Sequence, residues 1–119
     1  MQIQSEDADG ARGDREANRL ILDMLRSARP DDPILSEESA DDPVRLASRR
    51  VWIVDPLDGT REFGEGREDW AVHVALAIDG VAATGAVALP RRGLTLSSDA
   101  PPSLAPATAP PRMLVSRTR

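Results

Sequence analysis

The stretch VWIVDPLDGT, residues 51–60, is the most informative part of the sequence about the fold. Its first four residues are apolar without a break, which is typical of a strand covered on both faces. Asp55 follows directly, so its carboxylate is expected at the carboxyl end of that strand. Pro56 and the Asp58-Gly59 pair are turn residues, so we expect the strand not to continue beyond Asp55. The stretch therefore predicts a buried strand that delivers two carboxylates to the edge of a sheet, where open α/β sheets tend to bind ligands.

The two aspartates and Glu37 form a candidate metal site. Asp58 follows Asp55 closely enough for both carboxylates to converge, and Leu57 between them can turn its carbonyl oxygen inward. Glu37 lies in the segment SEES and would bring a third carboxylate from the end of another short strand. These oxygen ligands suit Mg²⁺, and three acids gathered without a cation would raise one another's pKa. Asp-Pro and Asp-Gly pairs are also common in ordinary turns, but their combination with Glu37 favours the metal site.

The next two residues suit a phosphate. Gly59 has no side chain to obstruct its backbone N–H, and Thr60 adds a hydroxyl group. Two Mg²⁺ ions about 4 Å apart would hold an attacking water and a phosphoryl oxygen for in-line displacement. The stretch therefore predicts phosphate chemistry beside the candidate metal site.

The rest of the chain predicts further elements around this strand. We expect residues 1–13 to be disordered and a helix to run from Asp14 to Pro30. Residues 33–36 read as a short buried strand and residues 40–49 as a loop or helical turn. The apolar face predicted for the helix is Ala17, Leu20, Ile21, Met24 and Ala28.

Strand character resumes after residue 69. Residues 70–78 and 81–89 read as a hairpin joined by Asp79-Gly80, a strong two-residue turn signal, and residues 94–97 as a further strand. Residues 100–111 contain five prolines and read as a semi-rigid linker. Within residues 112–119, the apolar residues Met113, Leu114 and Val115 predict the start of a new strand. The metal- and phosphate-binding core is thus expected within residues 14–99.

Composition limits the function classes. The formal net charge is −5, which argues against a general nucleic-acid binder. Cysteine is absent, which excludes disulfides and thiolate metal sites. We find no secretion signal at the polar, acidic N-terminus and no apolar run of about 20 residues that would span a bilayer. We therefore expect a cytoplasmic protein that does not bind membranes.

Taken together, ILSEES and WIVDPLDGTREF resemble the inositol monophosphatase superfamily. The REF after DPLDGT and the following WAVHVAL are similar to its CysQ-like 3′(2′),5′-bisphosphate nucleotidase branch, which acts in sulfate assimilation. The resemblance runs from about Asp14 to the end of the chain. It implies an α+β fold, a layered α/β sandwich of the sugar-phosphatase type, of which this chain would be the N-terminal sheet-and-helix portion.

The resemblance also implies roles for individual residues. It makes Glu37, Asp55, the Leu57 carbonyl and Asp58 ligands of Mg²⁺, and Gly59 and Thr60 contacts of the phosphate. Asp14 matches the family aspartate that supports Thr60 and the nucleophilic water, so the expected catalytic residues are Asp14, Glu37 and Thr60. The expected reaction is hydrolysis of a small phosphorylated metabolite, foremost 3′-phosphoadenosine 5′-phosphate to AMP and phosphate. The resemblance further implies that family members are about twice as long and supply another metal-binding aspartate from a C-terminal domain, whose first strand would be residues 112–119.

Several assignments have plain structural alternatives. Asp14 would be an excellent helix N-cap with or without catalysis. His73 lies on an apolar strand, which favours a packed and satisfied histidine over a base or ligand. Trp70 is expected in the core and Glu38 in solvent. Solvated surface positions are favoured over contacts with a second phosphate for four arginines, namely Arg61, Arg67, Arg91 and Arg92.

Alternative functions also remain at this stage. An aspartyl-phosphate phosphatase is rejected because its D-x-D-G-T spacing differs from the D-x-x-D-G-T found here. Inositol monophosphate or fructose 1,6-bisphosphate stay open as substrates, since the core motif is shared among these phosphatases. A truncated, non-catalytic metal-binding remnant is a further alternative, and a homodimer stays open.

Overall fold

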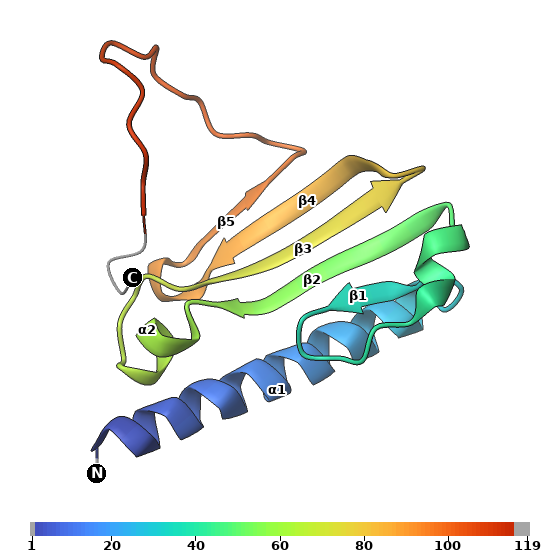
Figure 1. Cartoon of the computed structure of the whole chain (residues 1–119). Coiled ribbons are helices and arrows are strands. Elements are labelled where there is room, and N and C mark those ends of the chain that lie inside the picture. The colour runs from blue at the N-terminus through green and yellow to red at the C-terminus, as the bar shows by residue number, and fades with distance from the viewer. Residues whose placement is uncertain (1, 116–119) are drawn as a thin grey trace.

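The computed structural model describes residues 2–115, which form one mixed sheet accompanied by helices (Figure 1). The five strands lie in the order β1-β2-β3-β4-β5; β1 is parallel to β2, and the other neighbouring pairs are antiparallel. The predicted α+β class is confirmed. The elements in chain order are α1 (Gln2–Ala28), β1 (Ile34–Ser36), η1 (Pro43–Ala47), β2 (Arg50–Asp58), α2 (Thr60–Gly64), β3 (Ala71–Ile78), β4 (Val81–Leu89), η2 (Pro90–Arg92) and β5 (Leu94–Ser97).

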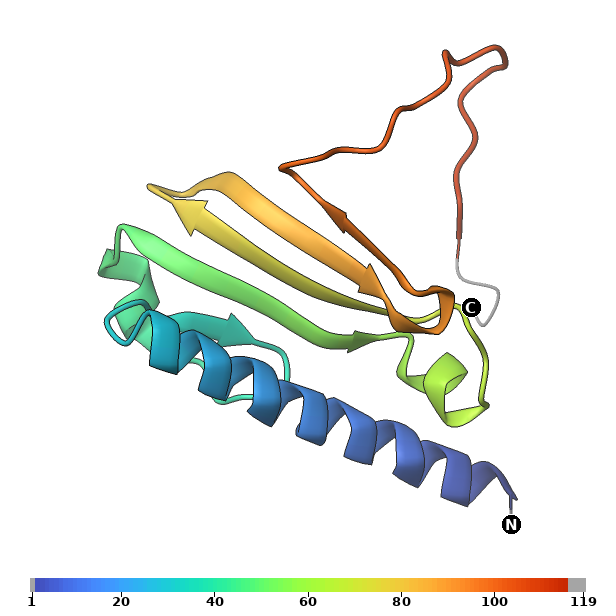
Figure 2. The ribbon, with the colours of Figure 1, turned by 180° about the vertical axis from the view of Figure 1, so that it is seen from behind.

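The long helix α1 runs beside β1 and β2, and the short helix α2 lies between its N-terminal half and the end of β2 (Figures 1 and 2). α1 contacts both α2 and β2. The side chains of Val54 and Pro56 in β2 are fully buried. The buried apolar residues of the described part are Leu22, Val54, Leu57, Ala71 and Leu76. The core thus lies beside β2, but the strand is not covered on both faces as predicted: of residues 51–54 only Val54 is buried, and Ile53 is 44% exposed.

Helix α1 differs from the prediction in its start and in its buried face. It begins at Gln2, so residues 2–13 are helical and not disordered. The side chains of Leu20 and Met24 are 62% and 64% exposed, so the predicted apolar face is wrong in part. From residue 8 onward, where burial is described, the buried positions recur every fourth residue and are Gly10, Asp14, Asn18 and Leu22.

Glycine explains why this stretch was misread. A Cβ atom on Gly10 would lie 2.6 Å from the Thr60 carbonyl oxygen, and one on Gly13 would lie 2.7 Å from the Phe63 ring. The N-terminal half of α1 therefore packs closely on α2 because it lacks side chains there. A search for apolar periodicity cannot detect such a face, since glycine contributes no hydrophobic signal.

The strands match the predicted ranges closely, with one correction. Residues 34–36, 71–78, 81–89 and 94–97 form strands, and the Asp79-Gly80 turn joins β3 to β4. β2, however, continues past Asp55 to Asp58, because β3 goes on pairing with it: Asp55 lies opposite His73, and Asp58 lies opposite Ala71. The register shifts between Asp55 and Asp58, which identifies the expected turn as a β-bulge within the strand.

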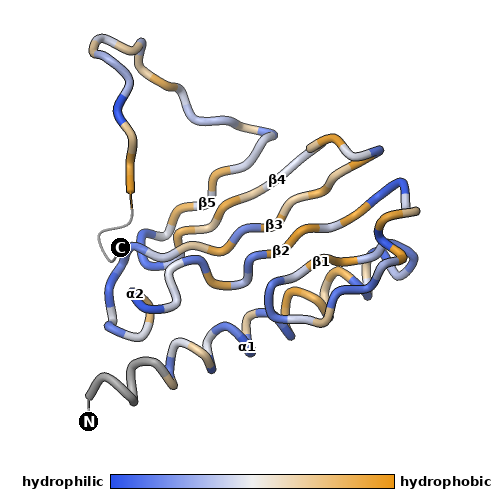
Figure 3. The backbone as a smooth tube through the Cα atoms, in the orientation of Figure 1, coloured by the Kyte–Doolittle hydropathy of each residue, from blue (hydrophilic) through white to orange (hydrophobic). Residues whose placement is uncertain are grey.

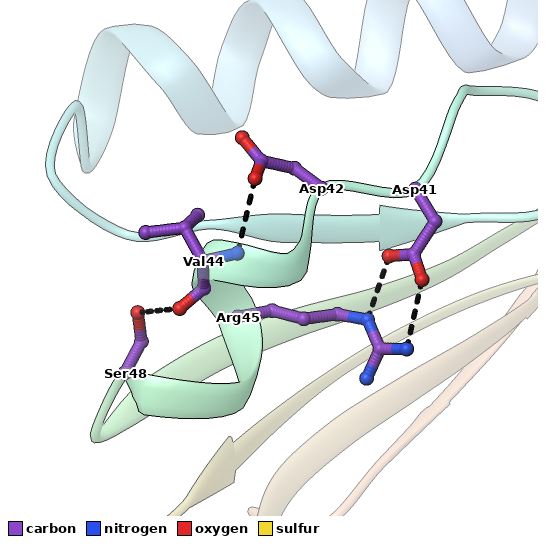
Figure 4. A network of polar contacts seen from close by, with 5 residues as sticks. All are labelled: Asp41, Asp42, Val44, Arg45 and Ser48. Carbon is purple, nitrogen blue, oxygen red and sulfur yellow. Dashed lines mark hydrogen bonds and ion pairs between the residues drawn. The ribbon is translucent and has the colours of Figure 1, made fainter.

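The segment between β1 and β2 contains the 3₁₀ helix η1, as the predicted loop or helical turn allowed. Asp42 accepts a hydrogen bond from the backbone N–H of Val44 at 3.0 Å and caps this helix (Figure 4). Arg45 donates two hydrogen bonds to Asp41, at 2.6 and 2.9 Å, and the Ser48 hydroxyl donates to the Val44 carbonyl at 2.8 Å. These local contacts shape the return of the chain from the acidic segment into β2.

The polar and apolar parts of the chain are separated along the fold. Apolar residues concentrate in the strands and in the second half of α1, while the loops around α2 are hydrophilic (Figure 3). Residues 101–115 lead away from β5 without forming a helix or strand, so the strand predicted at 112–119 is absent over residues 112–115. Residues 116–119 lie outside the described part. Within that part, no helix is long and apolar enough to cross a membrane.

Candidate active site

The β-bulge in β2 brings the two aspartates of the motif to the same side of the sheet. Side chains three residues apart on a regular strand point to opposite faces. Here three steps along β2, from Asp55 to Asp58, match only two steps along β3, from His73 to Ala71. The extra residue in β2 brings Asp55 and Asp58 to the same face of the sheet. Both side chains line one cavity of about 330 Å³.

This cavity also receives the third predicted acid. Glu37, immediately after β1, lines it together with Asp55, Asp58 and His73. The pKa of Glu37 is raised, first by the negative charge of Asp55, then by desolvation and by a hydrogen bond to Asp55. The charges of Asp14 and Asp58 raise it further. The predicted mutual repulsion of the acids is therefore present in the structure.

Thr60 connects the motif to α1. Its hydroxyl oxygen lies 2.8 Å from Asp14 Oδ2 and 3.2 Å from the carbonyl oxygen of Leu57. Asp14 is buried, and burial raises its pKa, opposed by the hydrogen bond from Thr60 and aided by the charge of Asp55. Asp14 lies in the middle of α1, so the N-cap alternative is wrong.

Gly59 is held in a conformation and a space that other residues do not fit. Its φ of 92° lies in the left-handed region, which side chains with a Cβ disfavour. A Cβ atom at Gly59 would also lie 3.1 Å from the Cβ of Trp70 and 3.2 Å from the Asp69 carbonyl oxygen. Gly59 thus ends β2 and begins α2 within a tight turn, and this places Thr60 directly beside Asp14.

A second link between α1 and the site was not found from the sequence. Asn18 Oδ1 accepts a hydrogen bond of 2.5 Å from the Ser36 hydroxyl, and Asn18 Nδ2 donates one of 3.0 Å to the Ser39 hydroxyl. Asn18 and Ser36 are both buried. These two bonds hold both ends of the SEES segment against α1 and thereby fix the position of Glu37. A lone Asn within a helix was the available signal, since a polar residue at a buried position requires partners.

His73 is satisfied by a hydrogen bond, as predicted, but the predicted apolar packing is wrong. Its Nε2 lies 3.0 Å from Asp58 Oδ2, and its side chain is 40% exposed in the acidic cavity rather than packed among apolar groups. Trp70 is half-buried, with its ring edge-on to Phe63 at a centroid distance of 5.1 Å. Arg61 and Arg67 form surface ion pairs with Glu65 and Asp69, respectively. Arg91, Arg92 and Glu38 are exposed, as expected.

The donor chemistry of this site fits a hard cation. Glu37, Asp55 and Asp58 offer carboxylate oxygens, and Leu57 offers a carbonyl oxygen that Thr60 already approaches. A cation would relieve the repulsion that raises the Glu37 pKa. Among the side chains that the structure describes, in residues 8–115, no three acidic or histidine side chains lie close enough together to enclose a metal ion. The structure therefore gathers the three predicted carboxylate ligands around one cavity without a closed coordination sphere, and Leu57 is not part of the cavity lining.

Comparison with known proteins agrees with this geometry. The family model described as "Inositol monophosphatase family" matches residues 5–100. A Mycobacterium bovis protein named 3′-phosphoadenosine 5′-phosphate phosphatase is 51% identical over 92% of this chain and 45% of its own length. The 3′(2′),5′-bisphosphate nucleotidase CysQ of Salmonella typhimurium is 41% identical over 71% of this chain and 35% of its own.

A solved structure shares the same arrangement. The extragenic suppressor protein suhB from Bartonella henselae superimposes with a TM-score of 0.67 and is 35% identical, covering 71% of this chain and 33% of that protein. The chain thus spans less than half the length of the curated relatives that it matches. The match to the family model, over residues 5–100, includes β1, β2 and the DPLDGT bulge, so the candidate site lies in the portion shared with the family.

Proposed function

The chain belongs to the inositol monophosphatase family, and we propose that it supplies the metal- and phosphate-binding part of a Mg²⁺-dependent phosphomonoesterase. The observation that carries the proposal is the hydroxyl of Thr60 held 2.8 Å from the buried Asp14 carboxylate, beside the cavity lined by Glu37, Asp55 and Asp58. The Thr60–Asp14 pair can orient water, and the three carboxylates beside it offer oxygen ligands.

Glu37, Asp55, Asp58 and the Leu57 carbonyl would hold Mg²⁺. When bound, the metal would supply positive charge to neutralise phosphoryl oxygens and lower the pKa of water. Gly59 and Thr60 would face the phosphate at the turn into α2. The donor set is made of oxygen alone, which is the set that Mg²⁺ prefers.

Thr60 and Asp14 would handle the proton of the nucleophile. The Thr60 hydroxyl donates to Asp14, so its oxygen is free to accept a hydrogen bond from water. As the water oxygen attacks phosphorus and the bond from phosphorus to the ester oxygen of the substrate breaks, one water proton passes to Thr60 while the Thr60 proton passes to Asp14. The leaving oxygen takes a proton from solvent water, and Asp14 returns its proton to the solvent. The raised pKa of Asp14 makes it a better proton acceptor than an ordinary aspartate. Glu37 would orient the same water through its carboxylate.

This mechanism makes water the nucleophile. The chain contains no cysteine, and its one histidine lies beside Asp58 and not beside a serine. Hydrolysis in ¹⁸O-labelled water under single-turnover conditions should place one labelled oxygen in the released phosphate. Trapping of a covalent phosphoenzyme would refute direct attack by water.

The proposed substrate is 3′-phosphoadenosine 5′-phosphate. The support is the 51% identity to the mycobacterial protein named for that substrate, which is higher than the identity to the Bartonella suhB structure. Since the chain spans 45% of the mycobacterial protein, groups that contact the nucleoside can also come from the remaining part of such proteins.

A segment exchange tests the proposal. In a chimera, this chain replaces the matching segment of the Mycobacterium bovis relative, and phosphate release is measured in Mg²⁺ and in EDTA. We expect Mg²⁺-dependent release from 3′-phosphoadenosine 5′-phosphate, with a kcat/KM at least tenfold above that for inositol 1-phosphate or fructose 1,6-bisphosphate. A folded chimera that releases no phosphate would contradict the proposed function. Preference for inositol 1-phosphate would contradict the substrate alone.

A further inference from the structure

His73 is the nitrogen-bearing side chain of the acidic cavity. β3 places it opposite Asp55 in the sheet register, and its ring reaches across to the next acid, with Nε2 3.0 Å from Asp58 Oδ2. The cavity lining contains three carboxylates, one imidazole and no arginine. His73 is also the single histidine of the chain.

Asp58 needs such a partner more than Asp55 does. The side chain of Asp58 is 61% exposed at the end of the bulge, whereas the carboxylate of Asp55 accepts a hydrogen bond of 3.2 Å from the backbone N–H of Leu57. Within the described residues, His73 makes the one hydrogen bond to the Asp58 side chain. Without His73, the Asp58 carboxylate would be free to rotate in solvent.

The chemistry of His73 and Asp58 determines which of the two donates the hydrogen bond. An ionised carboxylate only accepts hydrogen bonds, so the ring nitrogen that faces Asp58 must carry hydrogen. Nε2–H therefore donates to Oδ2, and Oδ1 is left without a partner in the described part of the chain. Hydrogen bonds of this kind orient the carboxylates that bind metals in proteins.

We propose that His73 is a positioning residue that holds Asp58 through Oδ2 and thereby presents Oδ1 to the cation. This inference rests on the proposed function, because it takes Asp58 as a metal ligand. His73 itself touches neither the cation nor the substrate. Its contribution is to limit the rotation of a ligand on an exposed bulge, so that binding of the cation has less conformational freedom to remove.

Two substitutions separate the donor from the shape of the side chain. His73→Leu keeps an apolar group of similar bulk on β3 but cannot donate. In His73→Gln, the side-chain amide nitrogen lies about where Nε2 lies in histidine and can donate to Asp58. Asp58→Asn serves as the reference for loss of the ligand itself. Binding of Mn²⁺ is measured on the 119-residue chain by the loss of the free-ion EPR signal, and no catalysis is required.

We expect His73→Leu to weaken Mn²⁺ binding by about tenfold, the lower end of the range for such supporting residues. His73→Gln should stay within about threefold of the wild type, because it restores the donor. Thermal unfolding without metal should be similar in the two variants. A purely structural role of His73 would not separate the two variants in Mn²⁺ binding.

The outcomes distinguish this inference from the proposed function. If Asp58→Asn weakens binding while His73→Leu does not, or if Gln fails as badly as Leu, the positioning role is refuted and the metal site stands. If the wild type binds no Mn²⁺, or Asp58→Asn binds it equally well, the metal assignment fails and this inference fails with it.

Discussion

Thr60 Oγ1 has one proton and two acceptors within reach, Asp14 Oδ2 at 2.8 Å and the Leu57 carbonyl at 3.2 Å. The shorter contact, to a carboxylate, is the stronger one. Donation to Asp14 frees the Leu57 carbonyl for a cation and the Thr60 lone pairs for water. The direction of this hydrogen bond therefore determines whether the Leu57 carbonyl can bind a cation and whether the Thr60 oxygen can accept from water.

Asp14→Asn should separate activity from stability. The amide oxygen of Asn still accepts from Thr60, so the free energy of unfolding at pH 7 should stay within about 1 kcal/mol of the wild type. The variant cannot take up the proton of the nucleophile, so phosphate release by the chimera should fall by about 100-fold or more. Denaturant unfolding and initial rates measure the two quantities. Asp23→Asn, an exposed position on α1, is the control. Full activity of Asp14→Asn would exclude Asp14 as the proton acceptor.

Glu37→Gln tests the repulsion among the acids. The pKa of Glu37 is raised in the fold, chiefly by Asp55, so the folded state binds its proton more tightly than the unfolded state does. The metal-free protein therefore loses stability as pH rises from the ordinary carboxyl pKa of about 4.3 through the raised value. The uncharged side chain in Glu37→Gln removes this loss of stability.

Without metal, Glu37→Gln should thus be more stable than the wild type at pH 7 and show no such gain near pH 4. Unfolding melts in EDTA across this range measure the difference. Saturating Mg²⁺ should reduce or reverse it at pH 7, because the metal stabilises the wild type through the charge that Gln lacks. A gain of equal size at both pH values would show that charge repulsion is not its source.

At the scale of elements, the sequence predicted the strands well and the helix poorly. β4 and β5 match their predicted ranges, because alternating apolar residues and the Asp79-Gly80 turn are local signals. The bulge in β2 was missed, since it depends on continued pairing with β3, which is a long-range contact. Pro and Gly in the motif suggested a turn, but pairing with β3 keeps residues 56–58 in the strand.

The candidate site was predicted to a similar degree. Acids and hydroxyls that follow a strand directly, such as Glu37 and Thr60, were visible as a motif, and the structure places them around one cavity or in contact with Asp14. His73 and Asn18 were not identified, because their partners lie 15 and 18 or more residues away. Periodicity shows only that such residues lie on a strand or helix.

The packing of α1 on α2 gives a prediction with a definite sign. Helix propensity alone would make Gly10→Ala stabilising by about 1 kcal/mol. The new Cβ would lie 2.6 Å from a backbone carbonyl oxygen of Thr60, so the two helices must separate. Overpacking of this kind costs about 1–3 kcal/mol, and we expect Gly10→Ala to be destabilising overall. Urea unfolding measures the change, with Ser27→Ala at an exposed position of the same helix as control. A stabilised Gly10→Ala would contradict the close packing of α1 on α2.

At the scale of the whole molecule, the chain has the sheet, the acids and the Thr60–Asp14 contact, but no enclosed metal site among the side chains described in residues 8–115. Its matched relatives are more than twice as long, and the family resemblance implies a further metal-binding aspartate in the part of the fold that this chain does not span. We therefore expect the 119-residue chain to bind one cation weakly and to release phosphate at about 1% or less of the chimera's rate.

The most direct test of the magnesium site is the Mg²⁺-induced change in the melting temperature of this chain. With a dissociation constant of about 1 mM, 10 mM Mg²⁺ should stabilise the fold by about 1.4 kcal/mol, a rise of roughly 5 °C or more for a domain of this size. Asp55→Asn should lose most of that increment, because it removes a charged ligand that lines the acidic cavity. Asp99→Asn, an exposed acid near β5, should keep it. An equal increment in all three proteins, or none in the wild type, would contradict the assignment of Glu37, Asp55 and Asp58 as a magnesium site.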